Sequence, residues 1–294
     1  MVSAVVLAAG RSMRMGGSPN KQFIPLLGKP SIYYSLAAFE QCAVIDAVVL
    51  VRRSENARQA EEVVRQFHFQ KVVAYAEGGP ERQNSVWNGL DQCDPATEIV
   101  AVHDGARPLV TPQLIEATVA SARAHGTGIA ATKVVDTIKE ADDQRRVVRT
   151  VDRTKLWAVQ TPQTVRFDLL RAAYAKVLET KTLVTDEAAA VELAGHPVQL
   201  VETPFLNLKI TTPADLAMAE ALLRAALTRG CPGGARLHST VLGILLVASS
   251  PTRVDPRRGG TPRPTGDPAG RAVLSPPPCG RRIYVPPPLL RGAK

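Results

Sequence analysis

A loop of small and basic residues follows the first apolar run and has the composition of a phosphate-binding turn. The run Ser3–Leu7 continues into LAAGRSMRMG, and NKQ follows at positions 20–22. Small residues leaving a strand let backbone N–H groups approach an anion closely, and Arg14 and Lys21 add positive charge. The loop has neither the Gly-Lys-Ser/Thr of a Walker motif nor a dinucleotide fingerprint. It predicts an anion site of another kind, or a tight turn with solvated basic side chains.

An aspartate at the end of a later apolar run is the candidate metal ligand. The sequence HDGARP at 103–108 follows the predicted strand Ile99–Val102. Open α/β sheets bind ligands beyond the carboxyl ends of their strands, and Mg²⁺ there bridges one or two carboxylates to substrate phosphates. Asp104 therefore fits a magnesium ligand, while a loop salt bridge with Arg107 is the alternative. We expect His103 to be structural.

Three other polar segments have weaker local signals. Taken alone, GGPERQNSV at 78–86 is better explained by a loop followed by a helix cap, and TDE at 185–187 is well explained by a helix cap. Lys209 lies in a predicted strand, Leu206–Ile210, whose other residues are apolar or small. Burying an unpaired ammonium is costly. We therefore expect Lys209 to have an acidic partner or an anionic ligand.

The elements that must position these residues alternate between short β-branched runs and helical patterns. This alternation is typical of an α/β protein with a mostly parallel sheet. The predicted strands are Ser3–Leu7, Ala47–Val51, Lys71–Ala74, Glu98–Val102, Gly128–Thr132, Val198–Val201 and Leu206–Ile210. The predicted helices are Ser31–Gln41, Glu55–Gln66, Gln83–Asp91, Pro112–Ala124, Phe167–Leu178, Glu187–Ala194 and Pro213–Leu227.

Residues Val134–Val151 interrupt this alternation and predict a long β-hairpin. β-Branched runs at both ends surround a polar centre, EADDQ, that favours a turn. Because a two-stranded hairpin is rarely stable alone, we expect this projecting β-arm to clasp a second copy of the chain in a homodimer.

The charge is concentrated in the last 64 residues. Of the formal net charge of +9, residues 231–294 contribute nine Arg and one Lys against two Asp, and they hold 12 of the 23 prolines. We divide the chain into a domain at 1–230 and a disordered, Pro- and Arg-rich tail at 231–294. A basic tail predicts at most non-specific binding to polyanions, and we expect no specific nucleic-acid partner.

The cysteines and the N-terminal segment favour a location in the reducing cytoplasm. The four cysteines, at 42, 93, 231 and 279, lack metal-ligand spacing. The N-terminal apolar run is only a strand long with no basic segment before it, so we expect neither a signal peptide nor a membrane helix.

The motifs in their order resemble the 2-C-methyl-D-erythritol 4-phosphate cytidylyltransferases of the non-mevalonate isoprenoid pathway. The resemblance covers about residues 1–228 and rests on LAAGRSMRMG, NKQF, GGPERQNSV, HDGARP, VVDTIK, TVDR, QTPQ, VTDEAAAVE and NLKITTPADL. It implies a Rossmann-like nucleotidyltransferase (GT-A-like) domain with a twisted, mostly parallel sheet and a β-arm. The implied reaction transfers CMP from CTP to methylerythritol phosphate and releases pyrophosphate.

The resemblance also implies a role for each matching residue. Arg14 and Lys21 would stabilise charge in the transition state, and Arg153 and Lys209 would hold the attacking phosphate in line. Asp104 would serve a hydrated Mg²⁺. The residues implied to bind CTP are Ala8, Ala9, Gly10, Gly79 and Ser85. Those implied to complete the sugar-phosphate pocket are Arg107, Thr137, Thr161 and Thr185, with Thr137 and Arg153 supplied across the dimer.

Two alternatives to this function remain open from the sequence. A ribitol 5-phosphate cytidylyltransferase would share most of the same phosphate-handling motifs. A non-catalytic nucleotide-binding or nucleic-acid-binding protein is disfavoured, because Arg14, Lys21, Asp104 and Lys209 are all present.

Overall fold

The computed structural model describes residues 1–10, 21–203 and 206–229, without the side chains of Lys21 and of residues 227–229. Arg14, the side chain of Lys21 and the expected tail at 231–294 therefore lie outside the described part of the chain.

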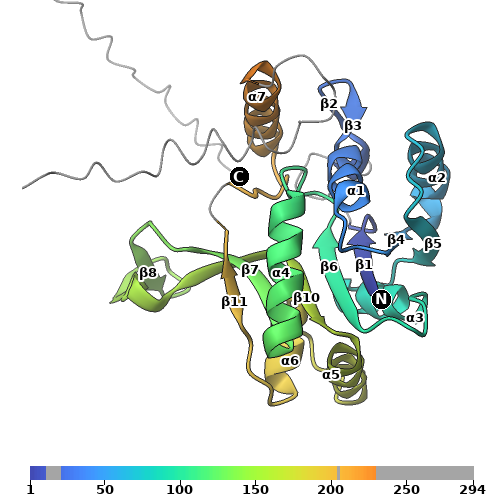
Figure 1. Ribbon diagram of the computed structural model, residues 1–294. Coiled ribbons are helices and arrows are strands. Elements are labelled where there is room, and N and C mark those ends of the chain that lie inside the picture. The colour runs from blue at the N-terminus through green and yellow to red at the C-terminus, as the bar shows by residue number, and fades with distance from the viewer. Residues whose placement is uncertain (11–20, 204–205, 230–294) are drawn as a thin grey trace, which may run out of the picture. The chain divides into compact units, whose positions relative to one another are not determined.

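Seven strands form one sheet in the order β11-β7-β10-β6-β1-β4-β5 (Figure 1). Only β10 runs antiparallel to its neighbours, so the mostly parallel α/β sheet predicted from the sequence is confirmed. The strands are β1 (Val2–Leu7), β4 (Ala47–Arg52), β5 (Val72–Glu77), β6 (Ile99–Asp104), β7 (Thr127–Lys133), β10 (Trp157–Arg166) and β11 (Leu200–Glu202). A two-residue ladder joins β2 (Pro25–Leu26) to β3 (Lys29–Pro30).

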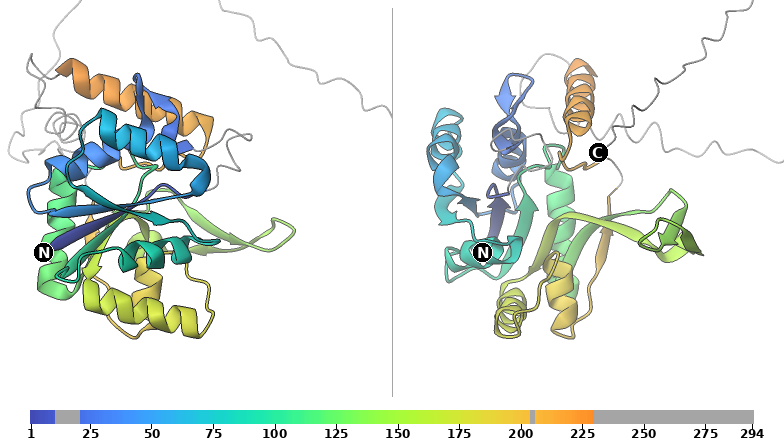
Figure 2. Two further views of the ribbon diagram at one scale, coloured as in Figure 1. Left: turned by 90° about the vertical axis from the view of Figure 1, so that its right-hand side faces the viewer. Right: turned by 180° about the vertical axis from the view of Figure 1, so that it is seen from behind.

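Helices cover both faces of this sheet because its central strands are apolar on both sides (Figure 2). All six residues of β1 are buried: Val2, Ala4 and Val6 belong to one core cluster, while Val5 and Leu7 belong to the other. The first cluster includes α1 (Ser31–Gln41), α2 (Ala57–Gln66) and α4 (Pro112–His125). The second includes α3 (Arg82–Asp91), α5 (Phe167–Glu179) and α6 (Glu187–Leu193). Near-continuous apolar strands are the pattern of a sheet buried on both faces.

The last helix, α7 (Pro213–Arg229), packs on a third, smaller core cluster with Leu26, Tyr34, Leu109 and Ile210. Its start is capped by two side chains. Thr212 Oγ1 accepts a hydrogen bond from the Asp215 N–H at 3.3 Å, and Asp215 accepts from the Thr212 N–H at 2.8 Å. These reciprocal bonds form a capping box.

Two sequence-based assignments were wrong. Leu206–Ile210 is not a strand but an irregular segment, whose Ile210 N–H donates to the Ala106 carbonyl at 2.8 Å. Strand β10 was not predicted, because Pro162 argues against a central strand. The pairing of β10 with β7 shifts register between Val159 and Gln163, so Pro162 lies within an irregularity of the ladder.

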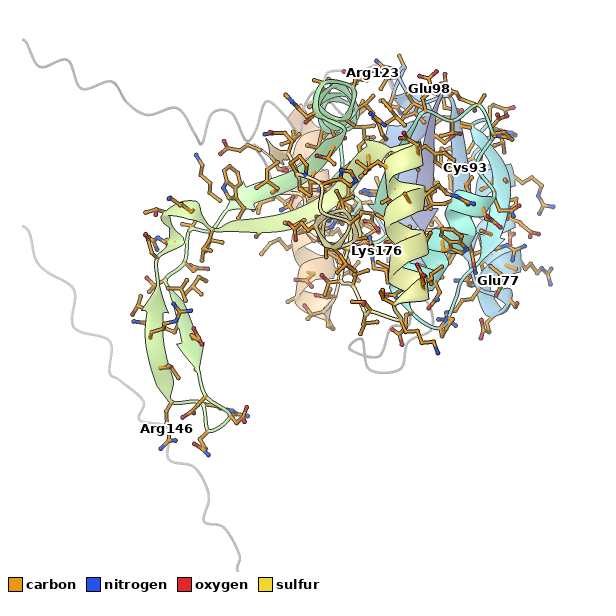
Figure 3. All side chains as sticks on the ribbon, turned by 90° about the horizontal axis from the view of Figure 1, so that it is seen from below. Glu77, Cys93, Glu98, Arg123, Arg146 and Lys176 are labelled. Atoms are coloured by element: carbon orange, nitrogen blue, oxygen red, sulfur yellow. The ribbon has the colours of Figure 1, made fainter. Side chains whose placement is uncertain are left out.

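The predicted hairpin is formed by β8 (Ile138–Ala141) and β9 (Val147–Val151), which pair only with each other. It extends away from the sheet, with Arg146 at its far end (Figure 3). Val135, Val147 and Val148 are each more than 60% exposed. We refer to residues 134–151 as the β-arm.

Within the described residues, no helix combines the length and apolar character that crossing a membrane requires.

Replacing Asp215 with Ala should lower the free energy of unfolding by about 1 kcal/mol near neutral pH, the usual effect of losing a helix cap. Hydrogen bonds from Thr211 and Thr212 lower the pKa of Asp215 from 3.8 to about 2. The carboxylate's contribution is therefore present above pH 4 and is lost as the pH falls toward 2. Urea unfolding at pH 7 and pH 3 checks this. The exposed Asp143→Ala is the control, and an equal loss at both pH values would contradict the prediction.

Candidate active site

The carboxyl ends of β1, β4, β5 and β6 meet at one edge of the sheet, because these four strands are mutually parallel. The segment after β1 starts at Ala8, the segment after β5 starts at Gly78, and Asp104 is the last residue of β6. The sequence-predicted nucleotide loops and the predicted metal ligand are thus brought to the same edge, where open α/β sheets bind ligands.

One side chain that the sequence analysis missed, Arg53, joins the two predicted nucleotide loops. Its Nε donates to the Ala9 carbonyl at 2.6 Å and its Nη2 donates to the Gly79 carbonyl at 3.3 Å. The neighbouring Asn56 is fully buried and donates from Nδ2 to the Ala8 carbonyl at 3.0 Å. These contacts fix the backbone of the first loop and tie it to the second.

The second loop is also fixed from within. The Gly79 N–H donates to Ser85 Oγ at 3.0 Å, so the two residues predicted to contact cytidine touch each other. A Cβ on Gly78 would lie 2.3 Å from the Ala9 Cβ. The close approach of the two loops therefore requires glycine at position 78. Gly10 is exposed beside them.

Asp104 lies at the centre of a cluster of three cations. Its Oδ2 is 2.7 Å from Lys209 Nζ, its Oδ1 is 3.3 Å from Arg82 Nε, and Arg107 Nε is 4.0 Å away. Burial alone would raise the pKa of Asp104, but Arg82 and Lys209 hold that pKa well below its ordinary value. Lys209 has the acidic partner that its sequence context required. The predicted Asp104–Arg107 contact exists but is the longest of the three.

A layer of hydrogen bonds beneath Asp104 fixes its backbone. The Asp104 N–H donates to Thr161 Oγ1 at 3.1 Å, and the Thr161 carbonyl accepts from the buried Asn207 Nδ2 at 2.7 Å. Arg107 Nη1 in turn donates to the Asn207 carbonyl at 2.7 Å. Thr161 is buried and its hydroxyl is used inside the protein, so it supports the pocket from below. The sequence analysis assigned no role to Asn207, although it lies two positions before Lys209 in the segment NLKI.

His103 belongs to this supporting layer, as predicted. It is fully buried, and its Nδ1 lies 3.1 Å from Thr161 Oγ1. Burial lowers the pKa of His103 to about 3, which keeps the ring neutral at physiological pH.

The segment containing Thr185 is anchored by α3 and β10. Gln83 Oε1 accepts from the Val184 N–H at 2.9 Å, and Gln163 Nε2 donates to Asp186 at 3.1 Å. Asp186 caps α6 by accepting from the Ala189 N–H at 2.9 Å, so the predicted helix cap is confirmed. Thr185 itself is exposed.

Thr137 and Arg153 lie apart from the Asp104 cluster. Thr137 lies in the β-arm, Arg153 follows it directly, and both are exposed. Arg153 donates to the Val135 carbonyl of the arm. Among the described residues, no hydrogen bond or ion pair connects either one to Asp104 or its cations. A single copy of the described chain therefore brings Lys209 and Arg107 to Asp104 but not Arg153.

The described residues contain no group of three or more His, Cys, Asp or Glu that could hold a metal ion alone. Asp104 is a single carboxylate. Mg²⁺ that is bound mainly by phosphates and water needs only one or two carboxylates, and the partner on Oδ2, Lys209, is 37% exposed on a flexible stem. The donor set fits a metal ion that arrives with a nucleotide.

The chain was compared with known proteins. Residues 2–225 match the family model of 2-C-methyl-D-erythritol 4-phosphate cytidylyltransferase (IspD). The enzyme of that name from Caldanaerobacter subterraneus subsp. tengcongensis is 44% identical over 224 residues, covering 76% of this chain and 99% of the relative. The Geobacillus kaustophilus enzyme is also 44% identical, covering 75% and 96%.

Solved structures agree with the sequence matches. The 4-diphosphocytidyl-2C-methyl-D-erythritol synthase from Anaerococcus prevotii aligns with a TM-score of 0.68 at 30% identity, covering 76% of this chain and 98% of that structure. The Thermus thermophilus cytidylyltransferase aligns with a TM-score of 0.63 at 30% identity, covering 75% and 98%. These matches show that the chain belongs to the 2-C-methyl-D-erythritol 4-phosphate cytidylyltransferase family.

Proposed function

We propose that this chain transfers the CMP moiety of CTP to 2-C-methyl-D-erythritol 4-phosphate. A phosphate oxygen of the acceptor attacks the α-phosphorus of CTP, the bond from that phosphorus to the β-phosphate oxygen breaks, and pyrophosphate leaves. The products are 4-diphosphocytidyl-2-C-methyl-D-erythritol and pyrophosphate. The family membership supports this reaction, and a ribitol 5-phosphate acceptor is not favoured because the matched relatives are named for methylerythritol phosphate.

The observation that carries the proposal is the cluster of Arg82, Arg107 and Lys209 around one carboxylate at the nucleotide edge of the sheet. Two anions must meet in this reaction. Preorganised cations lower the barrier by offsetting their repulsion and the charge that develops on the transferring phosphoryl group. The acceptor phosphate is already ionised at neutral pH, so the reaction needs no general base, and the neutral buried His103 is in keeping with that.

The nucleotide is assigned to the loops that start at Ala8 and Gly78. Ala8, Ala9 and Gly10 would line the triphosphate, and Gly79 with Ser85 would hold the cytidine. Arg14 and Lys21 are proposed to stabilise the transition state.

A magnesium ion bound with CTP would be held by Asp104 and would neutralise charge on the nucleotide phosphates. Lys209 would then exchange its 2.7 Å contact with Asp104 for the acceptor phosphate. Its long stem allows that exchange without movement of the backbone. Arg107 and Thr185 would complete the acceptor pocket, with Thr161 supporting it.

We also propose that the enzyme works as a homodimer in the cytoplasm, with Thr137 and Arg153 reaching the partner's site. The support is the β-arm, which extends from the sheet with three exposed valines, as is expected of a segment that packs on another surface.

The direct test is pyrophosphate release from CTP and Mg²⁺ with each acceptor offered separately. We expect release with methylerythritol phosphate and at most a trace with ribitol 5-phosphate. ATP, GTP and UTP serve as nucleotide controls. Equal release with both acceptors would contradict the proposed substrate.

Arg53→Ala should weaken CTP binding about tenfold, because the variant loses two hydrogen bonds that hold the nucleotide loops together. Calorimetric titration with CTP measures the change. The exposed Arg58 of α2 provides the matched control, Arg58→Ala, which should bind CTP normally. If Arg53→Ala binds CTP with unchanged affinity, Arg53 does not organise the CTP-binding loops.

Arg153→Ala and Lys209→Ala should each be nearly inactive alone, yet mixing them in equal amounts should restore about a quarter of wild-type turnover. Half of the dimers are then mixed, and each has one intact site that combines Lys209 of one chain with Arg153 of the other. Recovery is followed by pyrophosphate release after subunit exchange. Sedimentation verifies that the sample is dimeric and that subunits have exchanged. If activity then does not recover, Arg153 and Lys209 of one site come from the same chain.

A further inference from the structure

Arg82 uses its whole guanidinium to join two acidic residues from different parts of the chain. Nη1 and Nη2 form a bidentate pair with Glu187 at 2.7 and 3.0 Å, while Nε faces Asp104 Oδ1 at 3.3 Å. Glu187 is fully buried, and its Oε1 also accepts from the Tyr174 hydroxyl at 3.0 Å. The cation facing Asp104 from this side is therefore locked in place by the core.

The two cations nearest to Asp104, Lys209 and Arg82, differ in mobility. Lys209 Nζ sits at the end of a flexible stem, whereas Arg82 is held in a planar fork that matches a carboxylate. If Lys209 leaves Oδ2, Arg82 still fixes Oδ1 and keeps the other oxygen pointing outward. Glu187 shares the charge of Arg82, so that Asp104 does not face three uncompensated cations.

The first turn of α3 also contacts two segments to which the proposed function assigns substrates, the loop that contains Gly79 and the segment before α6. Ser85 holds Gly79 of the nucleotide loop, and the neighbouring Gln83 holds the segment before α6 through Thr182 and Val184. Arg82, the first residue of the same turn, adds the bond to Glu187 at the start of α6. One helical turn thus sets the spacing between the loop assigned to cytidine and the segment that carries Thr185.

We infer that Arg82 is a positioning residue of the transfer reaction. It orients the Asp104 carboxylate toward the metal–nucleotide complex and fixes the nucleotide loop relative to the acceptor segment, with Glu187 and Tyr174 as its anchor. The inference rests on the proposed function. It assigns Arg82 no contact with the reacting atoms.

The test compares Arg82→Lys with Arg171→Lys. Lysine keeps the charge but cannot make the bidentate pair and the Asp104 contact together. Arg171 is a matched control because it also joins two helices, α5 and α3, through an ion pair with Asp91 at 2.8 Å, on the surface over Trp87.

For Arg82→Lys we expect kcat to fall by about tenfold to a hundredfold, because misplacing a group by about 1 Å can cost a hundredfold, with a smaller rise of about threefold in the KM for CTP. A second measurement needs no turnover. Calorimetric titration with CTP in Mg²⁺ and in EDTA gives the factor by which the metal strengthens CTP binding, and this factor should shrink at least threefold in Arg82→Lys. Arg171→Lys should match the wild type in both measurements.

A purely structural role predicts a different result. The thermal midpoint of Arg82→Lys would fall, while its kcat and the metal-dependent gain in CTP binding would match the wild type, and that result would overturn the inference. If Arg82→Lys does not fold, Tyr174→Phe replaces it, because it removes only one hydrogen bond to Glu187 and keeps the ring. We expect the same changes, reduced to about twofold to threefold, and values equal to those of the wild type would overturn the inference.

The binding measurement separates this inference from the proposed reaction. A wild-type protein that binds CTP more tightly with Mg²⁺ but releases no pyrophosphate would contradict the proposed acceptor, while the comparison with Arg82→Lys would still decide the role of Arg82. If Mg²⁺ does not strengthen CTP binding by the wild type, the inference fails as well.

Discussion

The site depends on a buried carboxylate that is kept ionised by neighbouring cations. Moving an ion such as Asp104 out of water costs several kcal/mol unless opposite charges and hydrogen bonds replace its hydration. Here Arg82 and Lys209 supply the charges, and Thr161 accepts from the Asp104 backbone. The same contacts that make burial tolerable also gather positive charge where an anionic substrate is expected. Stability and function therefore depend on one set of interactions.

This dependence explains why the supporting residues come from so many elements. Asp104 ends β6, Arg82 starts α3, Thr161 lies in β10, and Lys209 lies in the irregular segment before α7. These elements lie far apart in the sequence, so only the tertiary fold brings the four residues together. The doubly covered sheet supplies the rigidity, because both of its faces are packed by apolar side chains. Preorganised electrostatics require such a scaffold, since charges that can relax lose much of their effect.

Local sequence patterns predicted the parts of the fold that local physics determines. Strand β1 and the helices α1 and α7 follow from their apolar patterns, and Asp104 was found because an acid follows a buried run. Lys209 was correctly expected to need a partner, because its neighbours are apolar. The partner itself could be named only from the fold.

The missed features all depend on contacts between distant positions. Arg82 meets Glu187 across 105 residues of sequence, and nothing within GGPERQNSV distinguishes that pair from an ordinary cap. Arg53 was missed because its side chain donates hydrogen bonds to backbone carbonyls. Every residue has such a carbonyl, so the residue types do not reveal these partners. Strand β10 was missed because its proline breaks the pattern that defines a central strand, although the register shift accommodates it.

The close approach of the loops that start at Ala8 and Gly78 has an evolutionary consequence. The Ala9 methyl group occupies the space that a side chain at position 78 would need, while the other atoms near that position leave ordinary van der Waals distances. A lineage could therefore replace Gly78 only after Ala9 had become glycine. In the reverse direction, position 78 would have to return to glycine before position 9 could become alanine again. The two positions are separated by 69 peptide bonds, yet their substitutions are expected to occur as an ordered pair.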